Sequence, residues 1–534
     1  MTGLRTLTAM LGARARERPD GTALVLDDRR LTFAALEDHA ARVASGLARL
    51  GVGGGDRVAV WLPNCLAWVE LEFALARLGA IAIAINTKFR GEEVGDILHR
   101  SQARVLVLWP GFKGIDFTGI LAGVDADRVA GLETLVTVDA TAADPSVGAV
   151  RDRRVVAYDH LLAHAPMDDD HARTDAPCNV FTSSGTTGAP KLVLHAQRGI
   201  AVHSDAVAGG FGYRSPDCVV LGMLPFCGVF GFNTVMGALA AGAPSVLMPV
   251  FEAGAAVELI ERERVTNTNG SDEMLRRILA EARPPGRIAT LREAGFAAFS
   301  GDARTLVEAG DALGKRFYMA YGSSEVQALL AHQPADAPPE VRARAGGPPV
   351  HPDTDVRVRS TEEGDDSLQP PGEAGELEIR GPSVMTGYLG DEQATREAFT
   401  DDGYLRSGDL GSLAEGEGFF YLTRRGDVLR LGGFLVSPVE IEDFLEKLEP
   451  VSAAQVVGVD TPSGPKPVAF VIPSPSQDID EEWIIRRCEA DLAKFKVPRR
   501  VVCVDAFPTT PSANGERVQR QALRRRAAEL IQDA

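Results

Sequence analysis

The sequence contains few cysteines and lacks the usual metal-binding patterns of cysteine and histidine. Six cysteines are spread through 534 residues without a CxxC pair, and nine histidines form no HExxH motif. Disulfide scaffolds and structural zinc sites usually show such residues at short, regular spacings. The sequence therefore predicts a protein of a reducing compartment, which we take to be the cytoplasm, without a structural metal.

No stretch is apolar and continuous enough to predict a secretory signal or a membrane-spanning helix. Residues 1–20 contain no long apolar core. Residues 218–251 carry no charge, but Pro225, Pro244 and Pro249 interrupt any single helix through them. We predict a buried strand, loop, helix and strand for this segment, and no membrane partner.

Basic residues are outnumbered by acidic ones, and the formal net charge is −18. Such a charge disfavours non-specific binding to nucleic acid or to an anionic membrane surface. A chain of 534 residues also exceeds what one hydrophobic core usually organises, so at least two domains are expected.

Residues 20–110 alternate between strand-like and helix-like runs, which is typical of a doubly wound α/β sheet. The strand-like runs are 23–26, 57–62 and 105–108, and the helix-like runs are 33–50 and 68–78. Residues 111–175 show no such pattern and are predicted to be an irregular approach to the next motif.

The segment 181–193, FTSSGTTGAPKLV, combines glycines, hydroxyls and one lysine between apolar flanks. Its glycines would let backbone N–H groups approach an anion, and its hydroxyls and Lys191 add donors and a positive charge. The flanks favour a hairpin between strands. Lys191 follows Pro190 and not a glycine, so this is not the usual P-loop. The predicted phosphate-binding residues are Ser183, Ser184, Gly185, Thr186, Thr187, Gly188 and Lys191.

This segment closely resembles the phosphate-binding signature of the adenylate-forming superfamily, TSGTTGxPKG, with Leu192 in place of the last glycine. That superfamily comprises acyl-CoA synthetases, luciferases and the adenylation domains of peptide synthetases. The resemblance, which spans nearly the whole chain, implies two steps. A carboxylate attacks the α-phosphorus of ATP, and a thiol such as that of coenzyme A then takes the acyl group from the acyl-adenylate.

Three further motifs carry the resemblance and imply a nucleotide site. Ser300, Gly301 and Asp302 stand where the family has a strand end beside the adenine. The run YGSSE, 321–325, resembles the family's YGxTE, whose tyrosine stacks on adenine and whose hydroxyl touches the α-phosphate. The resemblance thus implies nucleotide contacts for Tyr321, Gly322 and Ser324, catalytic roles for Thr186 and Ser324, and a catalytic, Mg²⁺-ligating role for Glu325.

The run GYLRSGDLG, 403–411, matches the family's GWxxTGD pattern. Its aspartate, Asp409, is implied to accept hydrogen bonds from the ribose hydroxyls of AMP or ATP. Arg424 matches the family's arginine that contacts ribose and phosphate.

The apolar run LPFCGVFGFN, 224–233, matches the part of the family that borders the acyl group. Gly228 stands where many members carry a histidine. No acidic residue lies between Asp217 and Glu252, which argues against an amino-acid substrate with its ammonium group. We predict a pocket for an apolar acid that is lined by Cys227, Gly228, Phe232 and Gly322.

The resemblance also implies two domains, a large N-terminal domain of residues 1–424 with several subdomains and a small mobile α/β lid of residues 425–534. Gly426 occupies the family's hinge position, usually aspartate or lysine, and glycine permits large backbone rotations. Gly432 and Gly433 would face coenzyme A. Nine basic residues lie between Lys494 and Arg526; they form either a solvated helix face or a contact for CoA phosphates.

The family's catalytic lysine near the C-terminus is replaced in this chain. Aligning VQRQALR, 518–524, with the family's IxRxxLR places Arg517 at the lysine position, and no lysine follows Lys496. A guanidinium presents its charge over a wide planar fork, whereas an ammonium is a compact point. Adenylation is therefore expected to suffer, while thioester formation, which does not use this residue, is expected to persist.

The leading hypothesis is an acyl-CoA ligase-like enzyme that forms thioesters from acyl-adenylates, supplied by a separate adenylating enzyme. One alternative is a complete ATP-dependent acyl-CoA synthetase in which Arg517 serves adequately. Another is a binding or regulatory protein that retains an adenylate site without turnover. Transfer to a carrier-protein thiol also stays open.

Overall fold

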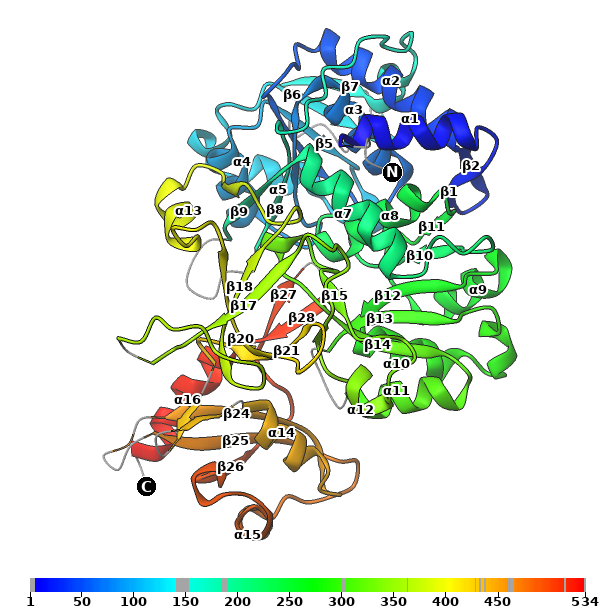
Figure 1. Ribbon diagram of the computed structural model, residues 1–534. Helices are drawn as coiled ribbons and strands as arrows, with labels where there is room; N and C mark the ends of the chain where they lie inside the picture. The colour runs from blue at the N-terminus through cyan, green and yellow to red at the C-terminus, as the bar shows by residue number, and fades with distance from the viewer. Residues whose placement is uncertain are drawn as a thin grey trace.

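The structure is a computed structural model. It describes residues 5–140, 153–183, 190–298, 303–362, 364–427, 429–431, 434–436, 438–459, 461, 465–512 and 515–532. Two large mixed sheets and a smaller antiparallel sheet form the N-terminal part, and a small α/β domain follows it (Figure 1). The α/β class and this division into a large and a small part confirm the predicted fold class. Among the described helices, none has the length and apolar character needed to cross a membrane.

The first sheet has eight strands in the order β19-β9-β8-β4-β3-β5-β6-β7. Strands β8 to β7 in this order run parallel, and β9 pairs antiparallel with β8. The strands are β3 (Arg57–Trp61), β4 (Ile81–Ala84), β5 (Val105–Leu108), β6 (Thr134–Thr137), β7 (Arg154–Ala157), β8 (Pro177–Thr182), β9 (Leu192–Ala196) and β19 (Gly387–Tyr388). The helices of this region are α1 (Leu7–Glu17), α2 (Phe33–Arg49), α3 (Leu66–Leu78), α4 (Gly91–Ser101), α5 (Phe117–Ala122) and α6 (Tyr158–Leu162).

The second sheet also has eight strands, in the order β15-β14-β13-β12-β10-β11-β1-β2. Its strands are β1 (Thr22–Leu26), β2 (Arg29–Thr32), β10 (Val220–Gly222), β11 (Ser245–Leu247), β12 (Asn267–Ser271), β13 (Glu293–Ala297), β14 (Arg316–Tyr321) and β15 (Ala331–His332). The accompanying helices are α7 (Gln197–Gly210), α8 (Val229–Ala241), α9 (Ala253–Glu263), α10 (Asp272–Glu281), α11 (Ala303–Ala312) and α12 (Pro339–Arg342).

The third sheet is antiparallel, in the order β16-β21-β20-β18-β17, and it leads into the small domain. Its strands are β16 (Gly346–Gly347), β17 (Asp355–Arg359), β18 (Ala374–Arg380), β20 (Leu405–Leu413) and β21 (Phe419–Arg424), with α13 (Glu392–Ala398) nearby. The predicted division after residue 424 falls at the end of β21.

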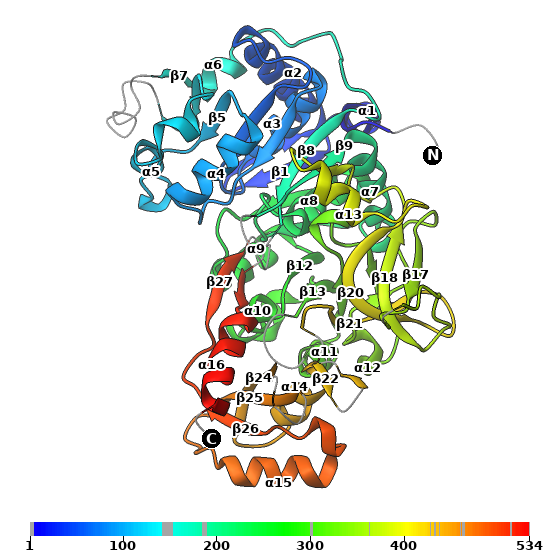
Figure 2. The ribbon, with the colours of Figure 1, turned by 90° about the vertical axis from the view of Figure 1, so that its left-hand side faces the viewer.

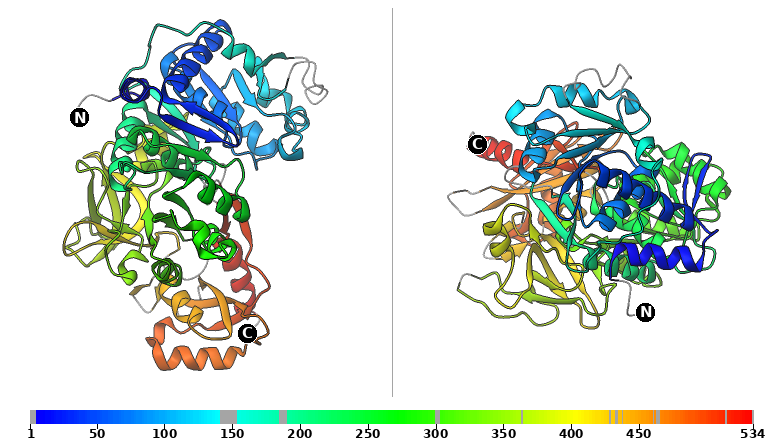
Figure 3. Two further views of the ribbon diagram at one scale, coloured as in Figure 1. Left: turned by 90° about the vertical axis from the view of Figure 1, so that its right-hand side faces the viewer. Right: turned by 90° about the horizontal axis from the view of Figure 1, so that it is seen from above.

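The small domain contains a three-stranded sheet, β24-β25-β26, and two hairpins. Its elements are β22 (Leu429–Leu431), β23 (Phe434–Val436), α14 (Pro438–Glu446), β24 (Val451–Val459), β25 (Lys466–Pro473), α15 (Glu481–Asp491), β26 (Arg500–Cys503), β27 (Thr509–Ser512), β28 (Gly515–Val518) and α16 (Arg520–Gln532). The domain lies at the end of the molecule opposite the first sheet (Figure 3). The β27–β28 hairpin projects from it toward the large N-terminal part (Figures 1 and 2).

The uncharged segment 218–251 forms β10, α8 and β11, as predicted. Helix α8 is buried on every side from Val229 to Ala240, because a helix that is apolar all round needs protein contacts on all its faces. It packs on α7 and β10, and α7 in turn contacts β8 and β9 of the first sheet. The segment is therefore core and not a membrane element.

Two sequence predictions about the first region were wrong. Residues 111–175 are not simply irregular, since β6 and β7 within them extend the first sheet in parallel. The strand predicted at 23–26 does form, as β1, but it belongs to the second sheet, where it pairs with β11 and β2, and not to the sheet that contains β3, β4 and β5. Strands β6 and β7 are only four residues long, and such short runs give a weak periodic signal.

A carboxyl group, that of Glu72, is buried between α3 and β8. Glu72 is 1% exposed, and its Oε2 accepts a hydrogen bond of 2.8 Å from Nδ2 of Asn179. Burial raises the pKa of Glu72 to about 8, because the ionised form loses its hydration. The folded protein therefore holds this proton more tightly than the unfolded chain.

We expect Glu72→Gln to stabilise the protein progressively as the pH rises from 5.5 to 7.5. Because folding raises the pKa of this acid, its proton contributes most to stability at a pH below the pKa of the unfolded chain. That contribution falls by about 1.4 kcal/mol per pH unit as the pH rises from the unfolded pKa to the folded pKa. Thermal midpoints of both proteins across this range would measure the effect. Glu133→Gln, at an exposed carboxylate whose pKa is lowered by Arg104, is the matched control. Parallel pH curves for wild type and Glu72→Gln would contradict the prediction.

Candidate functional site

The hydroxyl-rich segment begins and ends on a hairpin, as predicted. Strands β8 and β9 pair antiparallel up to Thr182 and Leu192, and the N–H of Ser183 donates to the carbonyl of Lys191 at 2.9 Å. Arg100 on α4 donates to the carbonyl of Pro190 at 2.6 Å. The predicted phosphate-binding residues Ser184, Gly185, Thr186, Thr187 and Gly188 lie outside the described residues.

Lys191, Tyr388 and Glu325 form a chain of contacts beside this hairpin. The Lys191 ammonium lies 4.4 Å from the centre of the Tyr388 ring, a cation–π distance. The Tyr388 hydroxyl donates to Oε1 of Glu325 at 3.2 Å, and the Met385 N–H donates to the Glu325 carbonyl at 2.7 Å. Tyr388 thus contacts the Lys191 cation with its ring face and the Glu325 carboxylate with its hydroxyl. Burial, and secondarily Glu325, raises the pKa of the Tyr388 hydroxyl, which therefore stays protonated and donates.

Asp409, Tyr321 and Arg424 form a second cluster where three strands meet. Tyr321 at the end of β14 donates from its hydroxyl to Oδ2 of Asp409 at 2.7 Å. Arg424 pairs with Oδ1 of Asp409 at 3.0 Å, and its Nη1 also donates to the carbonyl of Ser407 at 2.8 Å. Register explains the pairing, since Asp409 and Arg424 are direct partners across β20 and β21. The negative charge of Asp409 raises the pKa of Arg424.

His195 on β9 forms a hydrogen bond to the segment that follows Tyr321. Its Nε2 lies 2.8 Å from the carbonyl oxygen of Ser324, in the short helix η5 (Ser324–Val326). A carbonyl can only accept, so this nitrogen carries the ring proton. Burial lowers the pKa of His195 to about 4, which keeps the ring neutral. The phosphate-side hairpin and the Ser324–Glu325 segment are therefore coupled by one buried hydrogen bond.

Close packing of the backbone requires a residue without a side chain at position 322. A side chain there would meet the Cα of Ala328 at 2.4 Å, far inside van der Waals contact, so the backbone folds tightly over this position. The next turn thus lies against Tyr321 and Gly322. Gly322, predicted to line the acyl pocket, and Tyr321, predicted to contact the nucleotide, are therefore covered by the same turn.

The predicted acyl-side residues lie at and before the start of α8. Gly228 is the N-cap of that helix, and Cys227 is buried, with its thiol pKa raised to about 12 by burial. Phe232 packs edge-on against Phe181 and Trp68, with ring centres 5.2 and 5.6 Å apart. Phe232 is therefore a fixed aromatic wall that joins α8 to the hairpin strand β8.

Several predicted residues can be placed only in part. Ser300, Gly301, Asp302, Gly432 and Gly433 lie outside the described residues. The backbone of Arg517 lies in β28, opposite Thr510 of β27. Gly426 lies in the turn after β21, its carbonyl accepts a hydrogen bond from Arg524 at 3.2 Å, and an added Cβ would meet nothing within 4 Å.

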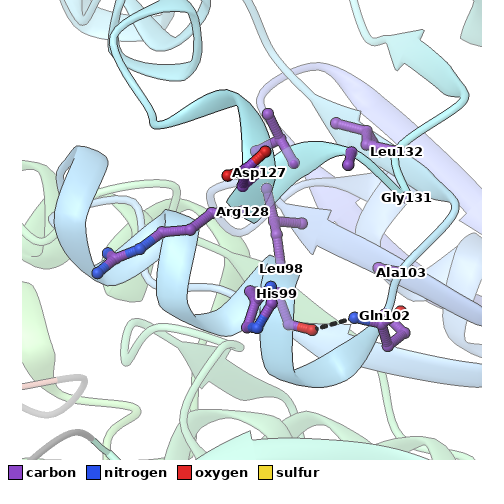
Figure 4. Close-up of a pocket in the computed structure, with 10 residues that line it drawn as sticks. Leu98, His99, Gln102, Ala103, Asp127, Arg128, Gly131 and Leu132 are labelled. Carbon is purple, nitrogen blue, oxygen red and sulfur yellow. Dashed lines mark hydrogen bonds between the residues drawn. The ribbon is translucent and has the colours of Figure 1, made fainter.

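A separate pocket of about 160 Å³ lies between α4 and η2 (Ala126–Val129). Leu98, His99 and Gln102 line it on one side and Asp127 and Arg128 on the other (Figure 4). None of the predicted site residues lines this pocket, so it is distinct from the candidate site.

The structure adds residues that sequence reasoning missed. Tyr388, His195 and Asn233 contact the Ser324–Gln327 segment. Asn64 binds the loop before α8: it donates to the carbonyls of Leu224 and Met248 at 2.8 and 3.0 Å and accepts from the N–H of Phe226 at 2.8 Å. Asn233 ends the apolar run 224–233, and no local pattern in the sequence marked any of the four as a contact of a distant segment.

A large and a small α/β part, with a hydroxyl-rich segment on a hairpin and Asp409 paired with Arg424, fit the class of adenylate-forming enzymes. Residues 11–389 match the model of the AMP-binding enzyme family, and residues 440–514 match that of the AMP-binding enzyme C-terminal domain. The chain belongs to the AMP-binding enzyme family.

Curated relatives resemble the chain over nearly its full length. A Mycobacterium tuberculosis protein named as the CoA ligase of a methyl-dioxo-octahydroindenyl propanoyl group is 32% identical over 525 residues, 97% of this chain and 99% of the relative. The mitochondrial medium-chain acyl-CoA ligase ACSF2 of Pongo abelii is 30% identical over 547 residues, 97% of this chain and 87% of the relative.

Solved structures share the fold. The anthranilate CoA ligase AuaEII, in complex with anthranoyl-AMP, has a TM-score of 0.84 and 25% identity, covering 100% of this chain and 99% of that one. ATP-bound MatB from Rhodopseudomonas palustris has a TM-score of 0.82 at 24% identity, covering 98% of this chain and 99% of that one.

We expect Asp409→Ala to weaken the binding of AMP by about 1.5–3 kcal/mol, the range for hydrogen bonds to a charged group. Calorimetry with AMP would measure the change. Asp402→Ala is the matched control, because Asp402 also pairs with an arginine of this sheet, Arg357, but lies at its surface. Unchanged AMP affinity in Asp409→Ala would remove this carboxylate from the nucleotide site.

Proposed function

We propose that the protein is an acyl-CoA ligase-like enzyme. In this proposal it forms CoA thioesters from acyl-adenylates of an apolar carboxylic acid, and its own ATP-dependent adenylation is weak or lost. The observation that carries the proposal is Arg517, at the position of the family's catalytic lysine in a chain without any lysine after Lys496.

The first half-reaction is expected to be the impaired one. In it a carboxylate oxygen bonds to the α-phosphorus of ATP and pyrophosphate leaves, which needs a cation on two small oxygen sites at once. The β27–β28 hairpin that carries Arg517 projects toward the large domain (Figures 1 and 2). A guanidinium positions charge differently from an ammonium, and misplacement of about 1 Å can cost on the order of a hundredfold in rate.

The second half-reaction draws on other groups. The CoA thiol attacks the acyl carbonyl, and AMP leaves. In this proposal Asp409 and Arg424 hold the nucleotide, Lys191 and the hydroxyl-rich hairpin neutralise the phosphate, and Tyr388 orients Glu325. Mg²⁺ favours one or two carboxylates together with phosphate oxygens and water, so Glu325 beside a triphosphate fits this ion during adenylation.

A complete ATP-dependent acyl-CoA synthetase is the second candidate. The relatives are named as CoA ligases, and the direction of the β27–β28 hairpin favours a terminal cation that reaches the large domain. Under the leading proposal, by contrast, a separate adenylating enzyme must supply the acyl-adenylate. One experiment distinguishes the two candidate functions. Acids are supplied with ATP, acyl-adenylates of the same acids are supplied separately, and the CoA thioester formed in each case is measured.

We expect Arg517→Lys to raise pyrophosphate release from ATP and acid by about ten- to a hundredfold, since a compact ammonium suits the two oxygen sites. Transfer from a preformed acyl-adenylate to CoA is expected to change little. Arg525→Lys, at an exposed position of α16, controls for the loss of a guanidinium nearby. Fast pyrophosphate exchange by the unchanged protein would establish the second candidate instead.

The acid is proposed to be apolar near its carboxyl end, and Gly228, which has no side chain, leaves room for a bulky group. We expect Gly228→Trp to reduce thioester formation from a bulky acyl-adenylate at least tenfold more than from acetyl-adenylate, because a packed pocket absorbs added volume poorly. The rates with CoA and each adenylate would be compared. Equal losses for the two acyl groups would argue against this placement.

A further inference from the structure

The segment that follows Glu325 has an unusual backbone. Gln327, Ala328 and Leu329 have φ values of 64°, 48° and 45°. None of the three is glycine, although the left-handed region costs free energy for residues with a Cβ. Such a run persists only where surrounding contacts hold it in place, and backbone strain of this kind gathers at functional sites.

The turn 327–329 folds back onto the YGSSE motif. The N–H of Ala328 donates to the carbonyl of Ser323, and the N–H of Leu330 donates to the carbonyl of Tyr321, each at 2.9 Å. The Cα of Ala328 also lies against Gly322. Any relaxation of the turn would therefore displace Ser323 and, next to it, Ser324 and Glu325.

Asn233 on α8 holds this turn. Its Nδ2 donates to the carbonyl of Gln327 at 2.7 Å and to the carbonyl of Val229 at 3.1 Å. Both partners are carbonyls, which only accept, so the NH₂ group of the Asn233 side chain must face them. The side chain is fully buried, and water cannot replace either bond.

We propose that Asn233 is a positioning residue. It fixes the strained turn to α8 and thereby sets Ser324 and Glu325 relative to the start of that helix, Gly228. The inference rests on the proposed function, in which Gly228 borders the acid and Glu325 serves the phosphate side. One buried amide then couples the helix that meets the acyl group to the loop that meets the nucleotide.

The test compares Asn233→Leu, which keeps the approximate volume and loses the donors, with Thr234→Val. Thr234 is buried on the same helix, but its hydroxyl bonds to the Phe230 carbonyl and receives Asn269, not the turn. Amide hydrogen exchange of the peptide 321–330 is expected to accelerate about tenfold or more in Asn233→Leu and to stay near wild type in Thr234→Val. Equal exchange in wild type and Asn233→Leu would overturn the proposal.

Turnover gives the second readout. With acyl-adenylate and CoA, kcat of Asn233→Leu is expected to fall about ten- to a hundredfold, with the KM for acyl-adenylate within about threefold. Because Ala328→Gly accepts φ of 48° without strain, it is expected to recover part of the kcat lost in Asn233→Leu, with rates normalised to the amount of folded protein. No recovery, or an equal loss of kcat in Thr234→Val, would contradict a positioning role.

Two outcomes separate this inference from the proposed function. If Asn233→Leu does not fold, Asn233→Ser takes its place, because serine keeps one donor at a shorter reach. This variant is expected to show the same faster exchange in residues 321–330, and exchange at the wild-type rate would overturn the inference. If the wild type forms no thioester from any acyl-adenylate, the proposed function fails, while the exchange comparison still decides whether Asn233 holds the turn.

Discussion

The pairing of Asp409 with Arg424 is the interaction on which the site depends. It joins β20 to β21 at the last residue before the connection to the small domain, and Tyr321 brings the end of β14 to the same carboxylate. Burying an ion pair costs hydration that its attraction only partly returns, yet removing one partner leaves an unpaired buried charge. This pair is therefore better understood as a geometric constraint than as a source of stability. It fixes where the second sheet, the third sheet and the interdomain connection meet.

A second set of contacts surrounds the Ser324–Gln327 segment and comes from elements that are distant in the sequence. His195 reaches it from the hairpin strand β9, Tyr388 from β19 and Asn233 from α8. Each is a single hydrogen bond of modest net energy. Together they leave the segment few alternative positions, and reacting groups need such preorganisation.

The sequence predicted the elements of the fold better than their arrangement. The hairpin around 181–193 and the buried block 218–251 both form where local pattern placed them. The errors concern partners: β1 joins β11 of the second sheet, and β6 and β7 join the first sheet although their segment lacks a periodic signal. Local periodicity reports which face of an element is apolar, and it carries no information about which distant strand will pair with it.

The same distinction between local sequence pattern and tertiary arrangement applies to the candidate site. Short motifs by themselves led to the proposed chemistry, because hydroxyls, glycines and Lys191 in one hairpin, or Glu325 after a glycine turn, indicate it within a few residues; they also placed Arg517 where a lysine is expected. Only the tertiary structure decided how these groups are held. Tyr388 meets Glu325 across 63 positions, Asn233 meets Gln327 across 94, and His195 meets Ser324 across 129. Contacts at such separations follow from strand order and helix packing, and a tyrosine, an asparagine or a histidine within an apolar run looks the same in the sequence whether it fills the core or positions a reacting group.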